Sequence, residues 1–491
     1  MKKVLITGAS GNVGAAVLAK LIEHKDFICT VLLRAKKTNY ALAKSLEKKS
    51  VKVFFGDLEN VSDCEKFIAE GDYILHFAGI IPPTADLYPE LSYKANVLAT
   101  QNLLNAAKKI NPQIKFLYSA SYAEYGSRDY THAWGRVGDP LIPAIFDYYA
   151  VTKILAESAV ISSQLTWLSL RLPGVLYDNI LRKNISSTIM FYTPWNTPIE
   201  WTTDRSLAHL VYTILKYDSQ GRLDKSFWRT IYNIGDGADA RTTGFGILER
   251  GFKMMGKSVK YFFKPNWNPL KNFHCLWLED SYKVHSFFDA GDVKLEGVEA
   301  FFSNLEKKNW YFRFGKPFAF FIRKCMIAPL LKQKTAPLYW ITHNDIEKLK
   351  VYYGSVEYAK NMSENWDRFY LLCENKNPKT GEFLDYENLK NIESAKHFRL
   401  NHGYDESKTQ LTLADLQEAA RFRGGACLAE KFPESQHTAI MWKCSEGHKF
   451  KLSVFAVLKA GFWCNECLDC KSDGFHNIAK NIPFYKQVLD S

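Results

Sequence analysis

The chain has 491 residues, of which 47% are hydrophobic and 24% are charged, and this composition excludes a disordered or fibrous protein. A single core rarely organises so many residues, so we expect two or three domains. The net charge of +12 suits an anionic partner or substrate but does not identify one.

The sequence contains no uninterrupted apolar stretch long enough to span a bilayer. The first apolar run is soon broken by glycines, so we expect a strand there in place of a signal peptide. Ten cysteines in such a chain indicate a reducing compartment, where clustered cysteines bind metals more often than they form disulfides. We therefore expect a cytoplasmic protein, with its oligomeric state left open.

A glycine-rich segment, TGASGNVG, follows the apolar residues 4–6 and precedes a segment with helical periodicity at 15–22. Gly8, Gly11 and Gly14 recur at every third position. Glycines allow a tight turn and a close approach to a pyrophosphate, and the helix that follows offers unpaired amides to the anion. The spacing predicts a phosphate-binding turn, with an ordinary glycine turn as the alternative.

Strand-like and helical segments then alternate through the first half of the chain. Strand-like runs occur at 4–7, 28–34, 51–56, 73–79, 114–121 and 166–173, and helical segments include 95–109 and 153–161. Such alternation is typical of βαβ units, which place helices on both faces of a parallel sheet. We predict a doubly wound α/β fold.

Arg34 ends the second strand-like run, about twenty residues beyond the glycine turn, where NAD-preferring folds carry an acidic residue. With Lys36 and Lys37 after it, Arg34 would suit the 2′-phosphate of NADP, although a solvated basic loop is the alternative. Asp57 follows the third run and could accept a hydrogen bond from the adenine amine. We expect NADP as the cofactor, with NAD as the second choice.

Seven motifs in order carry a resemblance to a known family: TGxxGxxG, GDL, HFAG, NVLAT, YSASYAEYG, YAVTK and RLPGVLY. Over about the first 310 residues the chain resembles the extended short-chain dehydrogenase/reductase family, also called the NAD-dependent epimerase/dehydratase family. The resemblance implies a Rossmann domain at 1–310 with a smaller substrate-facing part at 175–310. The implied cofactor-binding residues are Gly8, Ser10, Gly11, Asn12, Val13, Gly14, Arg34, Asp57, Leu58, Ala78, Lys153 and Pro173.

The same resemblance makes Tyr149 the catalytic acid/base, Lys153 its partner, Ser121 the donor to the substrate oxygen and Asn96 the support of a proton relay. A lysine ammonium one helical turn away and a cationic nicotinamide would favour the phenolate of Tyr149. Tyr149 could then exchange a proton with an alcohol or carbonyl oxygen while a hydride moves at the adjoining carbon.

Two departures from the family pattern bear on the reaction. Ser121, Tyr122 and Ala123 replace the Thr-Asp-Glu triplet of the sugar-nucleotide 4,6-dehydratases, so that dehydration is not expected. Gly174 stands where an asparagine often contacts a sugar nucleotide. We favour a reductase acting on a small carbonyl compound, with a sugar-nucleotide epimerase, or a non-catalytic scaffold that binds a cofactor, as alternatives.

The region 311–425 begins with basic residues interleaved with aromatic and aliphatic ones. Such a segment could lie at a membrane interface around 311–334. We favour a linker helix packed on the oxidoreductase, because Pro317 and Pro329 interrupt a continuous amphipathic helix. Further on, Thr412 is a candidate N-cap for a helix that ends at the glycines 424–425.

The last region, 426–491, carries a metal-ligand pattern. Three residues separate Cys444 from His448 and two separate Cys464 from Cys467, which predicts a tetrahedral Zn²⁺ site. Four protein ligands leave no open position, so the site is structural; Cys427 or Cys470 could replace one ligand, and unliganded cysteines are the alternative. The region resembles zinc-ribbon or treble-clef modules, which implies a protein or nucleic-acid partner.

Overall fold

The computed structural model describes residues 1–129, 132–180, 183, 187–371, 399–468 and 474–489. The first half of the chain is built on a seven-stranded sheet of order β10-β7-β5-β4-β1-β2-β3, in which every neighbouring pair is parallel. This confirms the predicted doubly wound α/β fold. The strands are β1 (Lys2–Thr7), β2 (Phe27–Leu33), β3 (Lys52–Phe55), β4 (Tyr73–His76), β5 (Lys115–Ser121), β7 (Thr166–Leu172) and β10 (Thr230–Asn233).

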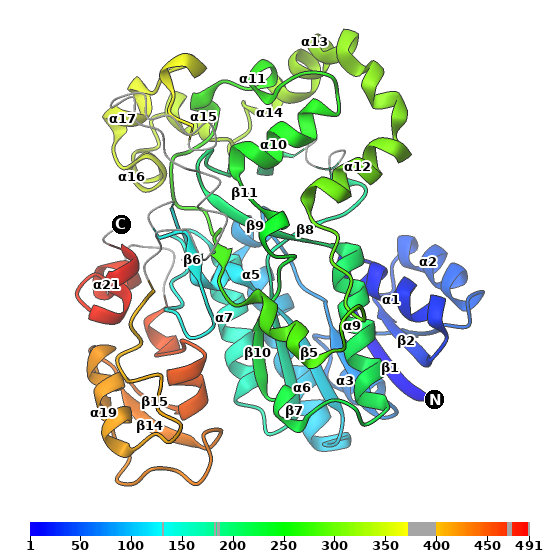
Figure 1. The fold of residues 1–491 in the computed structure, drawn as a ribbon, viewed down its shortest axis with the longest axis vertical. Coiled ribbons are helices and arrows are strands. Elements are labelled where there is room, and N and C mark those ends of the chain that lie inside the picture. The colour runs from blue at the N-terminus through cyan, green and yellow to red at the C-terminus, as the bar shows by residue number, and fades with distance from the viewer. Residues whose placement is uncertain (130–131, 181–182, 184–186, 372–398, 469–473, 490–491) are drawn as a thin grey trace.

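Helices cover both faces of this sheet (Figure 1). Several begin at side chains that accept hydrogen bonds from first-turn amides, as Asn60, Asp147 and Thr203 do. The strand order reverses beside β1, which is where doubly wound sheets open a crevice for ligands. The helices are α1 (Asn12–His24), α2 (Lys37–Glu47), α3 (Val61–Ile68), α4 (Thr84–Leu87), α5 (Pro89–Ser92), α6 (Ala99–Ile110), α7 (Tyr148–Ile161) and α9 (Asp204–Ser219).

A second layer lies beyond the carboxyl ends of the strands. Two small sheets form there, one from β8 (Gly174–Leu176), β9 (Pro198–Thr203) and β11 (Arg241–Thr243), the other from β6 (Trp134–Gly135) and β12 (Trp277–Leu278). The helices around them are α10 (Gly244–Lys253), α11 (Val259–Phe262), α12 (Val298–Lys308), α13 (Ala319–Phe321), α14 (Ala328–Leu330), α15 (Pro337–Thr342), α16 (Ile346–Tyr353) and α17 (Val356–Asn361). Ile327 and Leu330 share a core with Phe252, Phe263 and Trp267, so the expected linker packs on the substrate-facing part.

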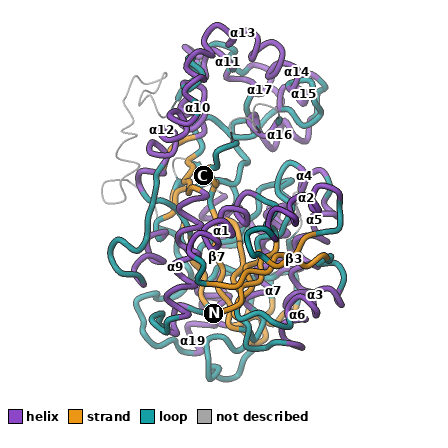
Figure 2. The backbone as a smooth tube through the Cα atoms, turned by 90° about the vertical axis from the view of Figure 1, so that its right-hand side faces the viewer, coloured by secondary structure: helices purple, strands orange, loops and turns teal. Residues whose placement is uncertain are grey.

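The C-terminal region lies beside the seven-stranded sheet, with α19 towards the end of the molecule opposite α13 (Figures 1 and 2). Thr412 caps α19 in a reciprocal capping box with Asp415, as its sequence predicts. Phe455 contacts Trp167 of β7 edge to face at 5.8 Å, and the two regions share one hydrophobic core. The elements here are α19 (Leu413–Phe422), β13 (Ala426–Cys427), β14 (Ala439–Lys443), β15 (Lys449–Ser453), α20 (Gly474–Ala479) and α21 (Pro483–Leu489).

None of the helices within the described ranges is both long enough and apolar enough to cross a bilayer.

Candidate active site

A cavity of about 870 Å³ opens at the carboxyl edge of the parallel sheet. Its wall brings together the glycine turn, the predicted catalytic pair and residues of the second layer. The sequence-predicted residues that line it are Gly8, Ser10, Gly11, Asn12, Val13, Gly14, Ser121, Tyr149, Lys153 and Pro173.

The glycine turn joins β1 to α1 in a conformation that two of its glycines require. Gly8 has φ 75°, and a Cβ there would lie 2.6 Å from the backbone nitrogen of Ala78. A Cβ at Gly14 would lie 2.4 Å from the carbonyl oxygen of Gly8. Gly11 has more room within the chain and is the N-cap of α1, so the first-turn amides face the cavity without a side-chain cap. This is the geometry of an anion site at a helix N-terminus.

Tyr149, Ser121 and Lys153 converge on the same cavity from α7 and the end of β5. The Ser121 side chain lies close enough to the Tyr149 phenol to lower the pKa of that phenol by hydrogen bonding. Lys153 donates from Nζ to the carbonyl oxygen of Ser119 at 2.7 Å, and its Nζ lies 5.9 Å from the centre of the Tyr149 ring. The Tyr149 phenol therefore lies beside the Ser121 side chain and the buried amino group of Lys153.

Burial acts on both titrating groups of this site. It raises the pKa of Tyr149 above its ordinary value, against the hydrogen bond from Ser121, which lowers it. Burial also lowers the pKa of Lys153 to about 8, although Glu124 and Glu157 oppose that shift. The phenolate of Tyr149 therefore needs an added positive charge in the cavity, and a cationic nicotinamide is the group that we expect to supply it.

Asn96 lies behind the cavity and is 2% exposed. Its amide donates to the carbonyl oxygen of Ile80 at 3.0 Å and to the Thr152 hydroxyl at 3.0 Å, and its side-chain oxygen accepts from the Ile80 amide at 2.7 Å. Asn96 thus connects the loop after β4 to α7 through hydrogen bonds. Gly79 of that loop lines the cavity.

The remaining predicted cofactor residues lie beside the turn. Arg34 and Asp57 follow β2 and β3 and are exposed, and Leu58 is buried behind them. The Ala78 amide donates to Thr7 Oγ1 at 3.3 Å, next to Gly8. These four residues are not among those that line the cavity, and their contact with a cofactor stays a prediction.

Sequence reasoning missed a second titratable cluster in the cavity wall. His274 forms an ion pair through Nδ1 with Asp147, and Asp86 accepts a hydrogen bond from the Tyr149 amide at 3.2 Å. Burial alone would lower the pKa of His274, but the charge and hydrogen bond of Asp147 raise it above its ordinary value. Burial and the neighbouring Asp147 raise the pKa of Asp86 to about 7. The aromatic segment that begins at Asn272 was expected to cover the pocket or a partner interface, and its residues 272–275 line the cavity. The pairing of His274 with Asp147 had no local signal, because only the fold brings the two together.

The far wall of the cavity departs from the family pattern in a way that the sequence could not show. A Cβ at Gly174 would lie 2.6 Å from the indole of Trp201, so this ring occupies the space where an asparagine side chain would extend. The region expected as a linker also reaches the cavity, contributing Lys334, Thr335, Trp340, Lys348 and Tyr352.

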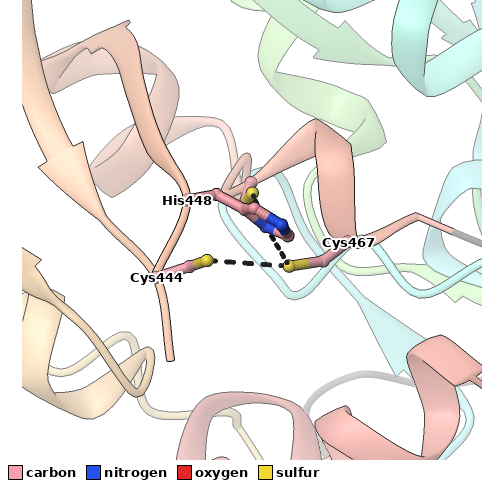
Figure 3. A group of neighbouring side chains, drawn as sticks. Cys444, His448 and Cys467 are labelled. Atoms are coloured by element: carbon pink, nitrogen blue, oxygen red, sulfur yellow. Dashed lines mark hydrogen bonds between the residues drawn. The ribbon is translucent and has the colours of Figure 1, made fainter. Parts of the chain in front are cut away.

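The four predicted metal ligands come together at the end of the hairpin β14–β15 (Figure 3). The Sγ atoms of Cys444 and Cys467 are 3.7 Å apart, and His448 Nδ1 lies 3.5 Å from Cys464 Sγ and 3.4 Å from Cys467 Sγ. A tetrahedral zinc ion with Zn–S near 2.3 Å and Zn–N near 2.0 Å holds its ligand atoms about 3.3–3.8 Å apart. The donor set and its spacing fit zinc. Cys427 is outside this group, and Cys470 lies outside the described residues.

Three kinds of comparison relate the chain to known proteins. Over 125 residues, 25% of this chain and 39% of the relative, it is 30% identical to a D-erythronate dehydrogenase of Haemophilus influenzae. Over 114 residues, 22% of this chain and 33% of the relative, it is 32% identical to a UDP-glucose 4-epimerase of Rickettsia canadensis. The matched part thus spans between a third and two fifths of these curated relatives.

Among solved structures, a UDP-glucuronic acid 4-epimerase from Bacillus cereus in complex with UDP-glucuronic acid and NAD has a TM-score of 0.47 and 20% identity, covering 62% of this chain and 99% of that one. A UDP-Glc/GlcNAc 4-epimerase from Campylobacter jejuni has a TM-score of 0.49 and 17% identity, covering 64% and 99%. Residues 4–176 match the model of the NAD dependent epimerase/dehydratase family, the part of the chain that carries the glycine turn, Ser121, Tyr149 and Lys153.

Proposed function

We propose that the chain is an NAD(P)-dependent epimerase that oxidises and re-reduces one hydroxyl-bearing carbon of a nucleotide-linked sugar. The observation that carries this proposal is the convergence of Tyr149, Ser121 and Lys153 on the cavity that also contains the glycine turn. A scaffold has no need of an acid/base phenol beside an anion-binding turn. Among the matched relatives, UDP-glucose 4-epimerases support the epimerase alternative over the reductase that we favoured on sequence. The choice of NADP over NAD rests on Arg34 and stays a prediction.

The chemistry follows from where these groups lie. A bound nicotinamide would take a hydride from the reacting carbon and return it. Tyr149 accepts the hydroxyl proton as the carbon is oxidised and gives it back on reduction. Ser121 holds the substrate oxygen beside Tyr149, and Lys153 favours the phenolate through its charge. Inversion requires the ketone to turn over between the two steps, and a cavity of about 870 Å³ leaves room for that motion.

The far wall supplies charges that fit a substrate diphosphate. Lys334 and Lys348 line the cavity, and Lys348 is paired with Asp345 at 3.0 Å. Lys334 is exposed, and its backbone carbonyl is held by the Trp340 indole at 2.8 Å. With Trp201 in the asparagine position, we assign diphosphate binding to Lys334.

To test this proposal, the protein is incubated with UDP-glucose or UDP-glucuronic acid in the presence of NAD⁺ or NADP⁺. The configuration at C4 of the sugar is then followed by NMR. We expect the wild type to interconvert one of these sugars with its C4 epimer. Tyr149→Phe should slow the conversion by about 10²–10⁴-fold and retain dinucleotide binding, because it removes only the proton transfer. Tyr148→Phe, a tyrosine on the same turn of α7, is the matched control and should stay active. Equal rates in wild type and Tyr149→Phe would favour the scaffold.

We also propose that Cys444, His448, Cys464 and Cys467 bind one structural Zn²⁺. The support is a complete tetrahedral donor set with buried sulfurs and no further protein group needed. A protein or nucleic-acid partner of this module stays a prediction.

A further inference from the structure

Large apolar side chains are exposed to solvent along the segment 310–326, which contains α13. We call this group the tip patch, and it consists of Trp310, Tyr311, Phe318, Phe320, Phe321 and Met326. Phe318 is 65% exposed, Phe320 63% and Phe321 59%. Single exposed apolar residues are common on protein surfaces, but several exposed aromatic residues along one short segment favour an interaction site.

The orientation of the tip patch is fixed by its inner side. Ala319 and Ile327 are buried, and they pack into the core formed with Phe263 and Trp267. A surface helix ordinarily buries its apolar residues and turns polar ones to solvent. Residues 318–327 instead bury the small or aliphatic side chains of Ala319 and Ile327 and expose their phenylalanines to solvent. The solvent-facing side of this segment is therefore apolar.

The segment that carries the tip patch contains basic residues and no acidic ones. Between Glu306 and Asp345 the sequence has no acidic residue. Lys316 and Lys324 are exposed within the patch, and Lys324 Nζ lies 5.6 Å from the centre of the Phe320 ring. The basic residues of this acid-free stretch are Lys307, Lys308, Arg313, Lys316, Arg323, Lys324, Lys332 and Lys334.

The tip patch also has the right position for a flat partner. Helix α13 lies at one extreme of the longest axis in both views of the molecule (Figures 1 and 2). A plane can touch this convex end without meeting the rest of the protein. A nucleic-acid strand needs a positive groove with bases stacked along it, and a convex apolar tip is a poorer fit for that ligand.

We propose that the tip patch binds the surface of a membrane that contains anionic lipids. Aromatic rings and Met326 enter the interface between headgroups and acyl chains, while Lys316 and Lys324 contact the anionic headgroups. The attachment is peripheral. The inference is independent of the proposed reaction.

The test is flotation of the full-length protein with vesicles of phosphatidylcholine and phosphatidylglycerol at low and high salt. We expect binding to the mixed vesicles at low salt, weaker binding at high salt, and little binding to pure phosphatidylcholine. Phe320→Ser/Phe321→Ser should weaken the partition by about tenfold or more, since it removes the inserted rings. Lys316→Glu/Lys324→Glu should weaken it at low salt only.

The matched control is Tyr282→Ser/Leu295→Ser, two exposed apolar residues outside the tip patch, which should bind vesicles like the wild type. Circular dichroism and thermal unfolding confirm that each variant is folded. The proposal is overturned if the wild type does not float with anionic vesicles, if the phenylalanine variant binds as tightly as the wild type, or if a single-stranded oligonucleotide binds the patch and vesicles do not.

Discussion

Asp147 performs two tasks at the start of α7. One carboxylate oxygen accepts from the Ala150 amide at 2.8 Å and caps the helix that carries Tyr149 and Lys153, while the other pairs with Nδ1 of His274. A carboxylate on Nδ1 leaves Nε2 as the other nitrogen of the ring. His274 lines the cavity, and its ring centre is 6.2 Å from that of Tyr149.

Asp147→Asn tests this pairing at the residue scale. Asparagine also caps helices, so α7 should persist, but the negative charge is lost. We expect the pKa of His274, raised in the wild type, to fall to or below the ordinary value of about 6.5 when measured by NMR of the imidazole protons. His209, away from this cluster, is the control. An unchanged pKa of His274 would contradict the assigned ion pair.

The same pairing sets the sign of a pH effect on stability. Because the folded pKa of His274 is raised, its contribution is full below the unfolded pKa and is lost as the pH rises through the folded pKa. The loss of unfolding free energy in Asp147→Asn should therefore be larger near pH 6 than near pH 9. Urea unfolding at the two pH values measures it, and a larger loss at the higher pH would contradict the argument.

At the scale of elements, the first sheet could be predicted because local signals agree with the fold. The strand-like runs 4–7, 28–34 and 166–173 are apolar, β-branched or aromatic, and correspond to β1, β2 and β7 within a residue or two. The turn at Gly8 was predictable because its conformation requires glycine. The metal cluster was predictable because its ligands lie in two short spacings.

The second layer could not be predicted in the same way. Its helices are short. Its contacts join segments that are far apart in the sequence, as the ion pair between His274 and Asp147 does. Trp340 and Lys348 had no sequence signal for the cavity, since nothing near them indicates contact with β5 or α7. Long-range contacts of this kind carry no periodicity that a single sequence can reveal.

The candidate zinc site beside the hairpin β14–β15 is tested by removing one of its ligands. Cys444→Ser should lower the zinc content from about one ion per chain to near zero and reduce the thermal midpoint, because metal binding supplies folding energy. A strong chelator should have the same effect on the wild type. Cys427→Ser, a cysteine outside the ligand group, is the control and should keep its zinc. If Cys444→Ser kept its full zinc content, Cys444 would not be a zinc ligand.

At the scale of the whole molecule, a buried ionic network joins the C-terminal region to the candidate active site. Arg171 on β7 pairs with Glu157 at 2.8 Å and donates to the carbonyl oxygen of Ala460 at 3.0 Å. Glu124 accepts from the Ser121 amide at 3.1 Å and lies 3.5 Å from Arg171. The C-terminal region therefore supports Ser121 through two buried side chains.

Arg171 supplies the positive charge that the buried Glu124 and Glu157 face in this network. Burial raises the pKa of Glu124 well above its ordinary value, and the neighbouring Glu157 raises it further, whereas the charge of Arg171 lowers it. Removing Arg171 would leave the buried Glu157 charge without a partner.

Arg171→Met should therefore lower the free energy of unfolding by about 3–5 kcal/mol. Arg205→Met is the matched control, because Arg205 pairs with Asp178 and Glu296 at the surface, where a pair contributes about 0–1 kcal/mol. Urea unfolding of both variants measures the difference. Equal effects would mean that the network does not join the two regions.

The measurement that tests the central claim most directly is a calorimetric titration of NAD⁺ and NADPH into the wild type, Gly11→Val and Arg34→Asp. Gly14→Val would clash with Gly8 in the chain itself, whereas Gly11→Val mainly blocks the approach of a pyrophosphate to α1. We expect one dinucleotide per chain in the wild type, no binding in a folded Gly11→Val, and a shift of preference from NADPH towards NAD⁺ in Arg34→Asp. Wild-type protein that binds neither dinucleotide, or Gly11→Val that binds as tightly as the wild type, would contradict it.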